Sequence, residues 1–465
     1  MKIREINIKN FRCFEALTVS FHENITVLTA TNGGGKTTIL DAIRISLWPY
    51  VKGFDLGSQT GKSATIQIDD VRIKHVSSSM EAQLPSIVEA IGCWPLQPTT
   101  DKYLWSQRRE NVKPRTNTLS DRQTTSLTKQ AEKIQEFVRK GQLDDNGEEY
   151  CLPLIVHLGT GRLWYQGRHN SEVDDTELDI NAQSRFWGYK NCITATSSYK
   201  QFEEWFGWIF KSYRELQIEE FEGKEIDQKL LESFKSAIDV VQGAINLLTE
   251  QETGWRDLQY RSSQNQQLVM EHNDHGYVPL SQLSDGLRNM VVMISDIAFR
   301  CYKLNPHLGN KAALETEGIV LIDEVDMFLH PSWQQRVISS LRQAFPNIQF
   351  IVTTHSPQVL STVPKECIRV LGTNAEGKNI AATPLASSYG EPSNDVLQAI
   401  MHVDPQPPVP EKRLLDELTS LVDQGEYQSS RAKKLLAELR QKLNDQHPQI
   451  LKIERSIRRQ EAFKA

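Results

Sequence analysis

The feature that most constrains the fold is a glycine-rich loop at residues 29–38. It reads Thr-Ala-Thr-Asn-Gly-Gly-Gly-Lys-Thr-Thr and stands between the apolar run 25–28 and a helix-like run that begins at Ile39. A strand, a glycine-rich loop and a helix in this order predict a P-loop, whose backbone N–H groups and helix N-terminus surround phosphate oxygens. The chain is therefore expected to bind a nucleoside triphosphate in an α/β fold.

The residue types of this loop have separate expected roles. Lys36 is expected to bridge the β- and γ-phosphates, and the Thr37 hydroxyl to ligate Mg²⁺. The expected nucleotide-binding residues of the loop are Asn32, Gly33, Gly35, Lys36, Thr37 and Thr38. Ala30 replaces the usual first glycine, and its methyl group fits if its φ stays negative. This departure predicts slow, regulatory hydrolysis.

Two further apolar strands end in polar residues suited to phosphate chemistry. Residues 318–322 precede Asp323 and Glu324, and the carboxyl ends of parallel strands line a ligand crevice. Asp323 is therefore expected to hold Mg²⁺ through water and Glu324 to act as general base. Residues 348–354 lead to His355, which can donate a hydrogen bond to the γ-phosphate. Each motif alone also fits a helix cap or a structural histidine, but their combination favours catalysis.

The segment 283–288, Leu-Ser-Asp-Gly-Leu-Arg, lies about forty residues before Asp323. It resembles the Leu-Ser-Gly-Gly-Gln signature of ABC-type ATPases, in which a serine hydroxyl and N–H groups at a helix N-terminus hold a γ-phosphate. Ser284 and Gly286 are the candidate residues. A Ser-Asp-Gly turn is also an ordinary helix cap. The prediction therefore rests on the position of this segment about forty residues before Asp323.

The order of these motifs is similar to that of the ABC-type AAA ATPases grouped with RecF, SMC and OLD proteins. The run 321–331, Leu-Ile-Asp-Glu-Val-Asp-Met-Phe-Leu-His-Pro, resembles the D-E-x-x-x-x-L-H-P pattern of that branch. Asn10-Phe11-Arg12 matches its opening Asn-Phe-Arg, which implies that Arg12 approaches the nucleotide. The strings 152–155 and 159–164, Leu-Pro-Leu-Ile and Gly-Thr-Gly-Arg-Leu-Trp, are similar to the PtuA-type ATPases of Septu anti-phage systems and retrons.

This resemblance implies ATP and Mg²⁺ as cofactors and an α/β fold. The expected architecture is an ABC-type P-loop ATPase head with N-terminal antiparallel strands, a helical insertion and a C-terminal helical tail. The expected divisions are 1–100 with the P-loop, 101–277 as insertion and helical subdomain, 278–403 with the remaining motifs, and 411–465 as the tail. The Q-loop glutamine of the family has no assigned position, and Arg162 is a candidate near it.

The sequence also predicts the structure of several segments outside the motifs. Residues 100–149 are polar and predict a surface insertion with one helix near 128–140. Residues 198–250 predict helices with an aromatic stripe that favours core over a base-stacking platform. Residues 404–410 form a proline-rich break, and 411–465, with 12 Lys or Arg against 9 Asp or Glu, predict two or three amphipathic helices. The leucines expected to form their apolar stripes are Leu414, Leu415, Leu418, Leu421, Leu435, Leu436, Leu439 and Leu443.

Composition narrows the class of protein. A net charge of −6 argues against a surface built uniformly for DNA. Six cysteines without C-x-x-C spacing predict reduced thiols, and no apolar run is long enough to span a membrane, so we expect a cytoplasmic protein. No Asp-x-Asp cluster follows His355, and the pair His272 and His275 favours an ordinary loop over a metal fragment, so a nuclease activity is expected to come from another chain.

One P-loop and one signature in a chain imply, by the resemblance, a head-to-tail homodimer with two composite sites. The expected function is that of an ATPase subunit of a bacterial anti-phage complex that assembles and gates a partner nuclease. That partner is expected to be an HNH subunit (PtuB-like) docked on the C-terminal tail, with DNA contacted through the complex and no membrane partner. The alternative for the tail helices is that they fold back on their own domain. The alternatives are a RecF-like or SMC-like DNA-repair ATPase that binds DNA itself and a transporter ATPase.

Overall fold

The computed structural model describes residues 1–58, 64–97, 101–114, 118–144, 147–162, 184–194, 199–263 and 266–464. The chain forms two compact units, Met1–Met401 and His402–Ala465. Nearly all of the regular structure lies in the first unit, which carries every sequence motif described above.

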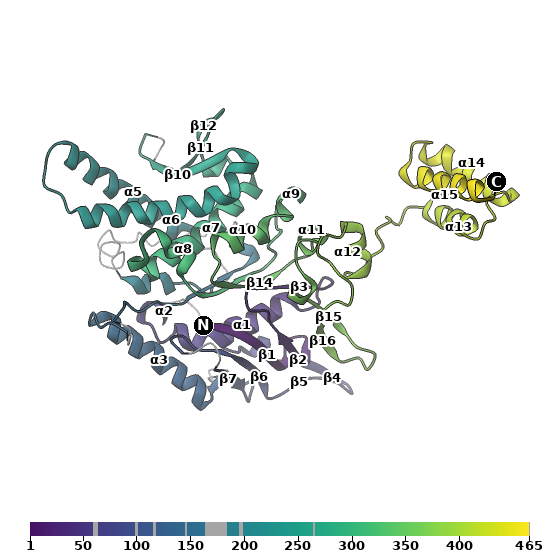
Figure 1. Ribbon diagram of the computed structural model, residues 1–465. Helices are drawn as coiled ribbons and strands as arrows, with labels where there is room; N and C mark the ends of the chain where they lie inside the picture. Colours follow the sequence, from purple (N-terminus) through teal and green to yellow (C-terminus); the bar gives the residue numbers. More distant parts are fainter. Residues whose placement is uncertain are drawn as a thin grey trace. The chain divides into compact units, whose positions relative to one another are not determined.

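A six-stranded sheet forms the centre of the first unit (Figure 1). Its order is β16-β15-β3-β14-β13-β9, and all neighbouring strands run parallel except β15 and β16. The strands are β3 (Ile25–Thr29), β9 (Leu154–Leu158), β13 (Gly318–Ile322), β14 (Ile348–Thr353), β15 (Ile368–Thr373) and β16 (Asn379–Ala382). Every residue of β3, β9, β13 and β14 is buried, as expected where both faces of a parallel sheet are covered.

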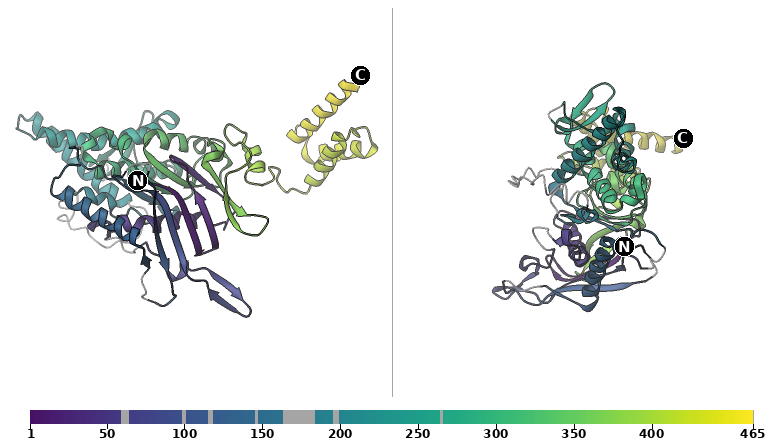
Figure 2. Two further views of the ribbon diagram at one scale, coloured as in Figure 1. Left: turned by 60° about the horizontal axis from the view of Figure 1, so that its bottom comes forward. Right: turned by 90° about the vertical axis from the view of Figure 1, so that its left-hand side faces the viewer.

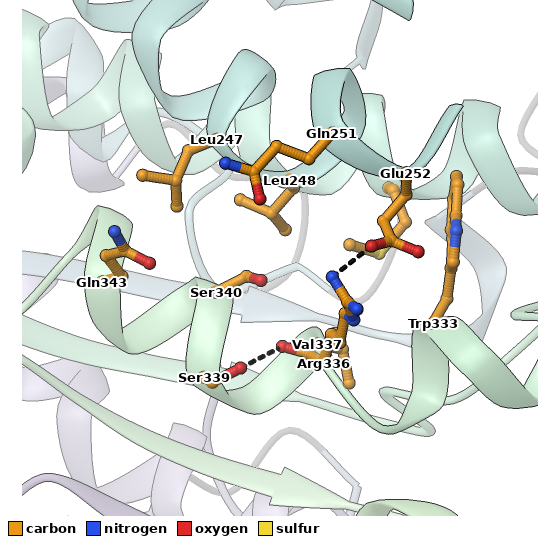
Figure 3. Close-up of a pocket in the computed structure, with 11 residues that line it drawn as sticks. Leu247, Leu248, Gln251, Glu252, Trp333, Arg336, Val337, Ser339, Ser340 and Gln343 are labelled. Carbon is orange, nitrogen blue, oxygen red and sulfur yellow. Dashed lines mark hydrogen bonds and ion pairs between the residues drawn. The ribbon is translucent and has the colours of Figure 1, made fainter. Parts of the chain in front are cut away.

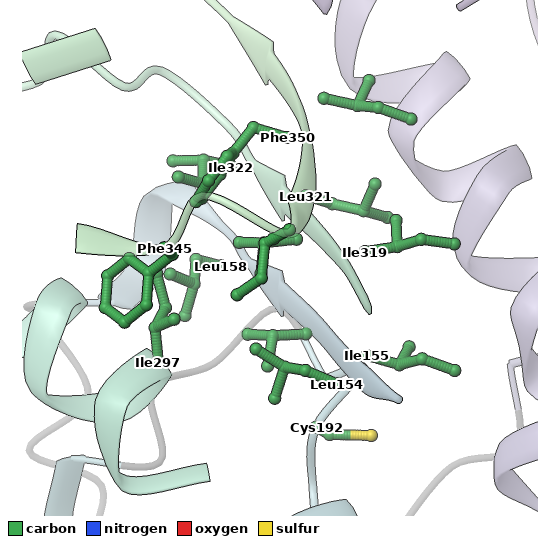
Figure 4. Close-up of a cluster of buried hydrophobic side chains, with 14 of the residues drawn as sticks. Leu154, Ile155, Leu158, Cys192, Ile297, Ile319, Leu321, Ile322, Phe345 and Phe350 are labelled. Atoms are coloured by element: carbon green, nitrogen blue, oxygen red, sulfur yellow. The ribbon is translucent and has the colours of Figure 1, made fainter. Parts of the chain in front are cut away.

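Helices α1 (Lys36–Val51) and α7 (Asp285–Leu304) cover the two faces of this sheet. Figure 4 shows Ile155, Ile319 and Leu321 on the side of α1, whereas Leu154, Leu158 and Ile322 point toward Ile297 of α7. Alternate residues of a strand face opposite sides, so one apolar run supplies both halves of the core. The P-loop and Asp323 follow β3 and β13 at the same edge of the sheet.

A five-stranded antiparallel sheet of order β2-β1-β6-β7-β8 packs on the other side of α1. Its strands are β1 (Lys2–Phe11), β2 (Phe14–Ser20), β6 (Ser86–Cys93), β7 (Tyr103–Arg109) and β8 (Leu119–Ser120). The expectation that 100–149 is a surface insertion was wrong for β7, which pairs with β6 along its length. The inward residues of β7 bond to backbone carbonyls: Trp105 Nε1 to Ser46 at 2.8 Å and Gln107 Nε2 to Ile45 at 2.6 Å.

The remaining helices pack around these sheets. The aromatic stripe belongs to the core: Trp205 and Phe206 of α5 are 1% and 0% exposed, and α5 packs along α6. The longer helices are α3 (Arg122–Arg139), α5 (Tyr199–Phe221), α6 (Gln228–Thr253) and α10 (Val337–Ala344). The shorter ones are α2 (Asp55–Ser58), α8 (Ala312–Glu315), α9 (Pro331–Gln334), α11 (Pro357–Leu360) and α12 (Ser393–Ala399).

Two small sheets complete the first unit. Strands β10 (Trp255–Arg261), β11 (Gln267–His272) and β12 (Gly276–Pro279) form an antiparallel sheet beside α5 and α6. The hairpin of β4 (Ile73–Val76) and β5 (Ser79–Ala82) extends away from the larger sheet, as the left view of Figure 2 shows. Residues Ile73 and Met80 of this hairpin are 60% and 67% exposed.

The second unit contains α13 (Lys412–Asp423), α14 (Ser430–Leu443) and α15 (Pro448–Lys464). Its leucines pack against one another in a separate core. The buried members are Leu415, Leu418, Val422, Tyr427, Ala432, Leu435, Leu439, Ile450 and Ile453. Leu414, Leu421, Leu436 and Leu443 are partly buried against this core. The apolar stripes expected to dock a partner are therefore largely occupied within the unit. In neither unit is any helix of the described residues long and apolar enough to cross a membrane.

Candidate nucleotide-binding site

The P-loop joins β3 to α1 and depends on its glycines. Gly33 and Gly35 have φ angles of +76° and +88°, a region that glycine adopts readily. A Cβ at Gly35 would lie 2.2 Å from the ring of Phe14, and one at Gly34 would lie 2.7 Å from the methyl group of Ala30. Ala30 is not among the described residues with a positive φ. Alanine therefore fits at this position, although it crowds the turn.

Lys36 is folded back onto the loop that precedes it. Its Nζ donates to the carbonyl oxygens of Ala30 at 3.1 Å and Thr31 at 3.3 Å. Burial lowers the pKa of Lys36, and the negative charges of Asp323 and Glu324 oppose that shift. The ammonium group thus has neutral acceptors nearby and carboxylates at longer range, an environment that an added anion would stabilise.

Asp323, at the end of β13, contacts both the P-loop and the end of β14. Its two carboxylate oxygens accept from the hydroxyl of Thr37 at 2.9 Å and from that of Thr353 at 2.6 Å. The Thr353 oxygen also accepts from the backbone N–H of Glu324 at 2.7 Å. Hydroxyl and carboxylate oxygens are the ligands that Mg²⁺ prefers, so Thr37 and Asp323 fit this ion. These contacts join the ends of β13 and β14 to the start of α1.

Arg162 fixes the backbone after β13. It follows β9 in the short helix Thr160–Arg162 and is 2% exposed. Its guanidinium donates to the carbonyl oxygens of Asp323 at 2.7 Å, Glu324 at 2.8 Å and Gly159 at 3.1 Å, and to Oδ1 of Asn289 at 2.8 Å. Burial lowers its pKa to about 10. Leu163 and Trp164, which complete the family string, lie outside the described residues.

Asn289 extends this connection to the signature helix. Its Nδ2 donates to the carbonyl oxygen of Met327 at 2.9 Å, so α7 is tied to the segment after Asp323 and Glu324. Glu324 itself has a φ of +49°, a strained value for a residue other than glycine. Asn289 belongs to none of the sequence motifs, since its partners Arg162 and Met327 lie far along the chain.

Ser284 and Gly286 lie at the N-terminus of α7. The Ser284 hydroxyl accepts from the backbone N–H of Leu287 at 3.5 Å, and a Cβ at Gly286 would lie 2.6 Å from the carbonyl oxygen of Phe328. No hydrogen bond between described residues joins either of them to the P-loop of the same chain. The structure thus joins the P-loop, Asp323 and Glu324 through hydrogen bonds and, among the described residues, joins neither Ser284 nor Gly286 to the P-loop.

Arg12 is held by two carboxylates. It lies 2.6 Å from Asp41 on α1 and 2.8 Å from Asp70, and the Asp41 carboxylate also contacts Arg44 at 3.1 Å. The adjoining Cys13 and Phe14 touch Gly35 of the P-loop, since a Cβ there would meet both. Arg12 is therefore next to the loop, although its ion-pair partners are the acidic side chains of Asp41 and Asp70.

The end of β14 forms another set of hydrogen bonds beside the site. The hydroxyl of Thr354 donates to Asp326 at 2.5 Å, and that of Ser356 donates to Gln334 at 2.7 Å. His355 lies between these two residues and is half-buried. Asn32 and Gly33 are exposed on the P-loop, whereas Thr38 is buried in α1.

His157 is a buried residue that the sequence motifs did not indicate. It lies on β9 opposite Leu321 of β13, and neither of its ring nitrogens has a hydrogen-bond partner among the described residues. Burial lowers its pKa to about 4, with the nearby Arg44 acting in the same direction. The ring is therefore neutral behind the acidic end of β13.

The rings of His272 and His275 stack at 4.6 Å, with His272 Nε2 3.0 Å from the carbonyl oxygen of Thr253. In the described part of the chain, no three histidine, cysteine or acidic side chains gather where they could hold a metal ion. The geometry of this pair is that of a packed turn between β11 and β12.

Comparison with known proteins gives one family and several relatives. A model of the AAA domain family matches residues 5–268, more than half of the chain. The Vibrio cholerae serotype O1 biovar El Tor protein named "Retron Vc95 probable ATPase" is 26% identical, across 94% of this chain and 86% of that protein. The Escherichia coli protein named "Retron Ec83 probable ATPase" is 28% identical, across 95% and 84%. The "Septu protein PtuA" of Bacillus mycoides (strain KBAB4) is 37% identical over 25% of this chain and 16% of its own length.

Proposed function

This chain belongs to the AAA domain family and, within it, to the ABC-type ATPases of the RecF, SMC and OLD branch, and we propose that it hydrolyses ATP as a subunit of an anti-phage defence complex. The observation that carries the ATPase assignment is the 2.9 Å contact between Thr37 and Asp323, which are 286 residues apart. It places the phosphate-binding loop against the acidic strand end. The similarity to retron and Septu proteins supports the defence role.

Each residue of the site has a role in this proposal. The P-loop N–H groups and Lys36 hold the phosphates, and Thr37 with Asp323 holds Mg²⁺, which neutralises phosphate charge when bound. Glu324 orients and deprotonates the attacking water as general base. Arg162 and Thr353 keep the Glu324 backbone in place, and His355 contacts the γ-phosphate.

The signature completes the site of a second copy. Ser284 is exposed at a helix N-terminus and has no hydrogen bond to its own P-loop among the described residues, so its N–H groups and hydroxyl are available to a phosphate held elsewhere. A head-to-tail C2 dimer would bring Ser284 and Gly286 of one chain to Lys36 of the other. ATP bound between the two chains would favour the closed dimer, and hydrolysis would release it.

Hydrolysis in this proposal is slow and regulatory. Ala30 keeps its methyl group against Gly34, where the loop must turn around the phosphates. The crowded turn limits how closely the loop can close on the nucleotide. Hydrolysis would therefore be slow, and its rate would set how long the complex stays assembled. ATP binding rather than rapid turnover would then set the state of the complex.

A partner nuclease would supply the effector chemistry, and an HNH subunit of the PtuB type is the partner we propose. The buried leucines of α13 and α14 pack within the core of their own unit, so they are not available to a docked partner. The nuclease is therefore proposed without a defined contact surface, and DNA would be reached through the complex.

The proposal is tested with purified wild-type chain, Lys36→Ala and Glu324→Gln, and with Glu315→Gln as a control for an exposed carboxylate on α8. ATP binding and hydrolysis are measured together with phage plating on cells that carry the gene and its neighbours. We expect Lys36→Ala to lose binding, and Glu324→Gln to bind ATP but hydrolyse it about 10²-fold more slowly or worse. The control should match the wild type.

The possible outcomes separate the two parts of the proposal. Hydrolysis by Glu324→Gln at the wild-type rate would refute the catalytic assignment. Loss of hydrolysis with unchanged phage protection in both variants would leave an ATPase and remove the defence role. Phage protection by this gene after all of its neighbouring genes are deleted would contradict the proposed partner nuclease.

A further inference from the structure

The C-terminal unit buries its leucines and leaves its charges outside. Its core takes Leu435 and Leu439 from α14 and Ile450 and Ile453 from α15. On the outward side of these helices the exposed residues are mainly lysine and arginine. A surface with this character binds through charge rather than through apolar contact.

The charge of these two helices is opposite to that of the chain. Helices α14 and α15 contain ten lysines and arginines and three acidic residues, a net charge of +7. The whole chain has a net charge of −6, so all other residues together sum to −13. Positive charge concentrated on one small element of an acidic protein is the electrostatic footprint of a nucleic-acid contact.

Three of these cations form a stripe on α15. Lys452, Arg455 and Arg459 follow one another at i, i+3 and i+7, so they share one side of the helix. Ile450 and Ile453 define the opposite, buried side. All three cations are exposed, and we call them the α15 stripe.

Several acidic residues of the unit form ion pairs with cations outside the α15 stripe. Glu454 binds Arg440 at 2.6 Å and Arg458 at 3.6 Å, while Glu417 binds Arg431 at 2.6 Å. No ion pair between described residues involves a member of the α15 stripe. The stripe therefore presents three unpaired positive charges to solvent, where they can attract a polyanion with a strength that salt reduces.

We infer that the α15 stripe binds the phosphate backbone of nucleic acid, independently of base sequence and of the nucleotide site. Arginine and lysine contacts to phosphate give affinity that falls with salt as counterions are released. The charge contrast favours nucleic acid over a protein partner, because the unit exposes few large apolar side chains: Val403, Val409 and Phe463 in the described residues. The contact would act as a tether that keeps the chain on DNA or RNA.

The test uses the full-length chain and a fluorescently labelled DNA duplex of arbitrary sequence, with anisotropy measured between about 50 and 200 mM salt. The variant is Lys452→Gln with Arg455→Gln and Arg459→Gln. We expect its plot of log K against log salt to be less steep by about 1 for each lost phosphate contact, and its affinity to fall for duplexes of every sequence. ATP hydrolysis should not change.

The matched control is Arg122→Gln with Lys129→Gln and Lys133→Gln, which removes the same charge from one exposed side of α3. Circular dichroism confirms that both variants fold.

The inference is overturned if the wild-type chain does not bind the duplex at low salt, if the slope of the stripe variant is unchanged, or if the control loses as much affinity. Stripe-dependent binding to vesicles of anionic lipid, without binding to DNA, would also overturn it. DNA binding without any ATP hydrolysis would support this inference and refute the proposed function.

Discussion

Two arginines, Arg162 and Arg300, are buried to nearly the same degree, with exposed fractions of 2% and 1%. Arg162 bonds to the backbone of Asp323 and Glu324, whereas Arg300 bonds to Asp296 on its own helix and to the carbonyl oxygen of Gly188. Both positions need a planar, multidentate donor, which lysine cannot supply. Comparing the two arginines therefore distinguishes the effect of losing a buried arginine from the effect of moving the backbone at the proposed general base, Glu324.

Arg162→Lys should lower stability and catalysis together. Losing two or more buried hydrogen bonds should cost about 2–4 kcal/mol of unfolding free energy, and a displaced Glu324 should reduce kcat at least about tenfold at saturating ATP. Arg300→Lys should lower stability by a comparable amount with little change in kcat. Denaturant unfolding and steady-state ATPase assays measure both effects, and equal kcat losses in the two variants would argue against a positioning role.

His157 makes stability depend on pH. Its pKa is about 4 in the folded chain against an ordinary value of 6.5, so the unfolded chain takes up a proton that the folded chain refuses. This contribution to stability is full above pH 6.5 and is lost as the pH falls toward 4. At pH 5 the loss, relative to the full contribution at high pH, should amount to about 2 kcal/mol.

His157→Gln should reduce that loss of unfolding free energy between pH 7 and pH 5. The exposed His75, on β4, provides the control, and His75→Gln should keep the wild-type pH dependence. Denaturant titrations at the two pH values give the comparison. Parallel pH profiles for the wild type and His157→Gln would show that the buried ring does not titrate as described.

At the scale of elements, the contact between α7 and the segment after β13 depends on Gly286. A methyl group there would lie 2.6 Å from the carbonyl oxygen of Phe328, so the helix or the segment must move. Gly243 lies inside α6 with nothing within 4 Å of a built Cβ. Replacing glycine by alanine should therefore lower the free energy of unfolding at position 286 and raise it at position 243.

Gly286→Ala should destabilise the chain by about 1–3 kcal/mol because of overpacking. Gly243→Ala should stabilise it by about 0.5–1 kcal/mol, since alanine is the better helix former. Thermal and denaturant unfolding provide the measurement. A stabilising effect of Gly286→Ala would contradict the close packing of α7.

The central strands could be predicted because burial on both faces gives a continuous apolar run, as in 25–28 and 318–322. The prediction of an α/β ABC-type head is confirmed. Strand β7 could not be predicted in this way, since its inward positions include Gln107 and Arg109, which bond to carbonyl oxygens of neighbouring segments. Their polarity made a buried strand look like surface.

The candidate site could likewise be predicted from sequence only in part. The P-loop and the Asp323–Glu324 pair are local strings whose spacing is visible in sequence. Asn289 is joined to Arg162 across 127 residues, and Arg162 to Asp323 across 161. The residues next to Asn289 and Arg162 in the sequence do not indicate these contacts, because the partners come together only when the chain folds.

A nucleotide site shared between two chains would let two inactive variants complement each other. Lys36→Ala disables the P-loop of one chain, and Ser284→Arg would disable the signature of the other. In a head-to-tail heterodimer of these variants, one site carries both lesions and the second carries neither. Mixing equal amounts should therefore restore about one quarter of wild-type ATPase activity, since about half of random dimers are mixed.

The mixture is compared with each variant alone at the same total concentration. Native mass spectrometry with ATP confirms that mixed dimers form. A mixture as inactive as its components, although mixed dimers are present, would mean that each chain completes its own site.

The way Arg162 holds the site also has an evolutionary consequence. Its bonds run to main-chain oxygens at positions 323 and 324, and these oxygens are present whatever side chain the gene encodes. Glu324 can therefore be replaced without removing this support. If Glu324 is the general base of the proposed function, a single codon change at 324 would remove hydrolysis and leave the fold and nucleotide binding in place, so lineages that dispense with hydrolysis would not have to pass through an unfolded intermediate.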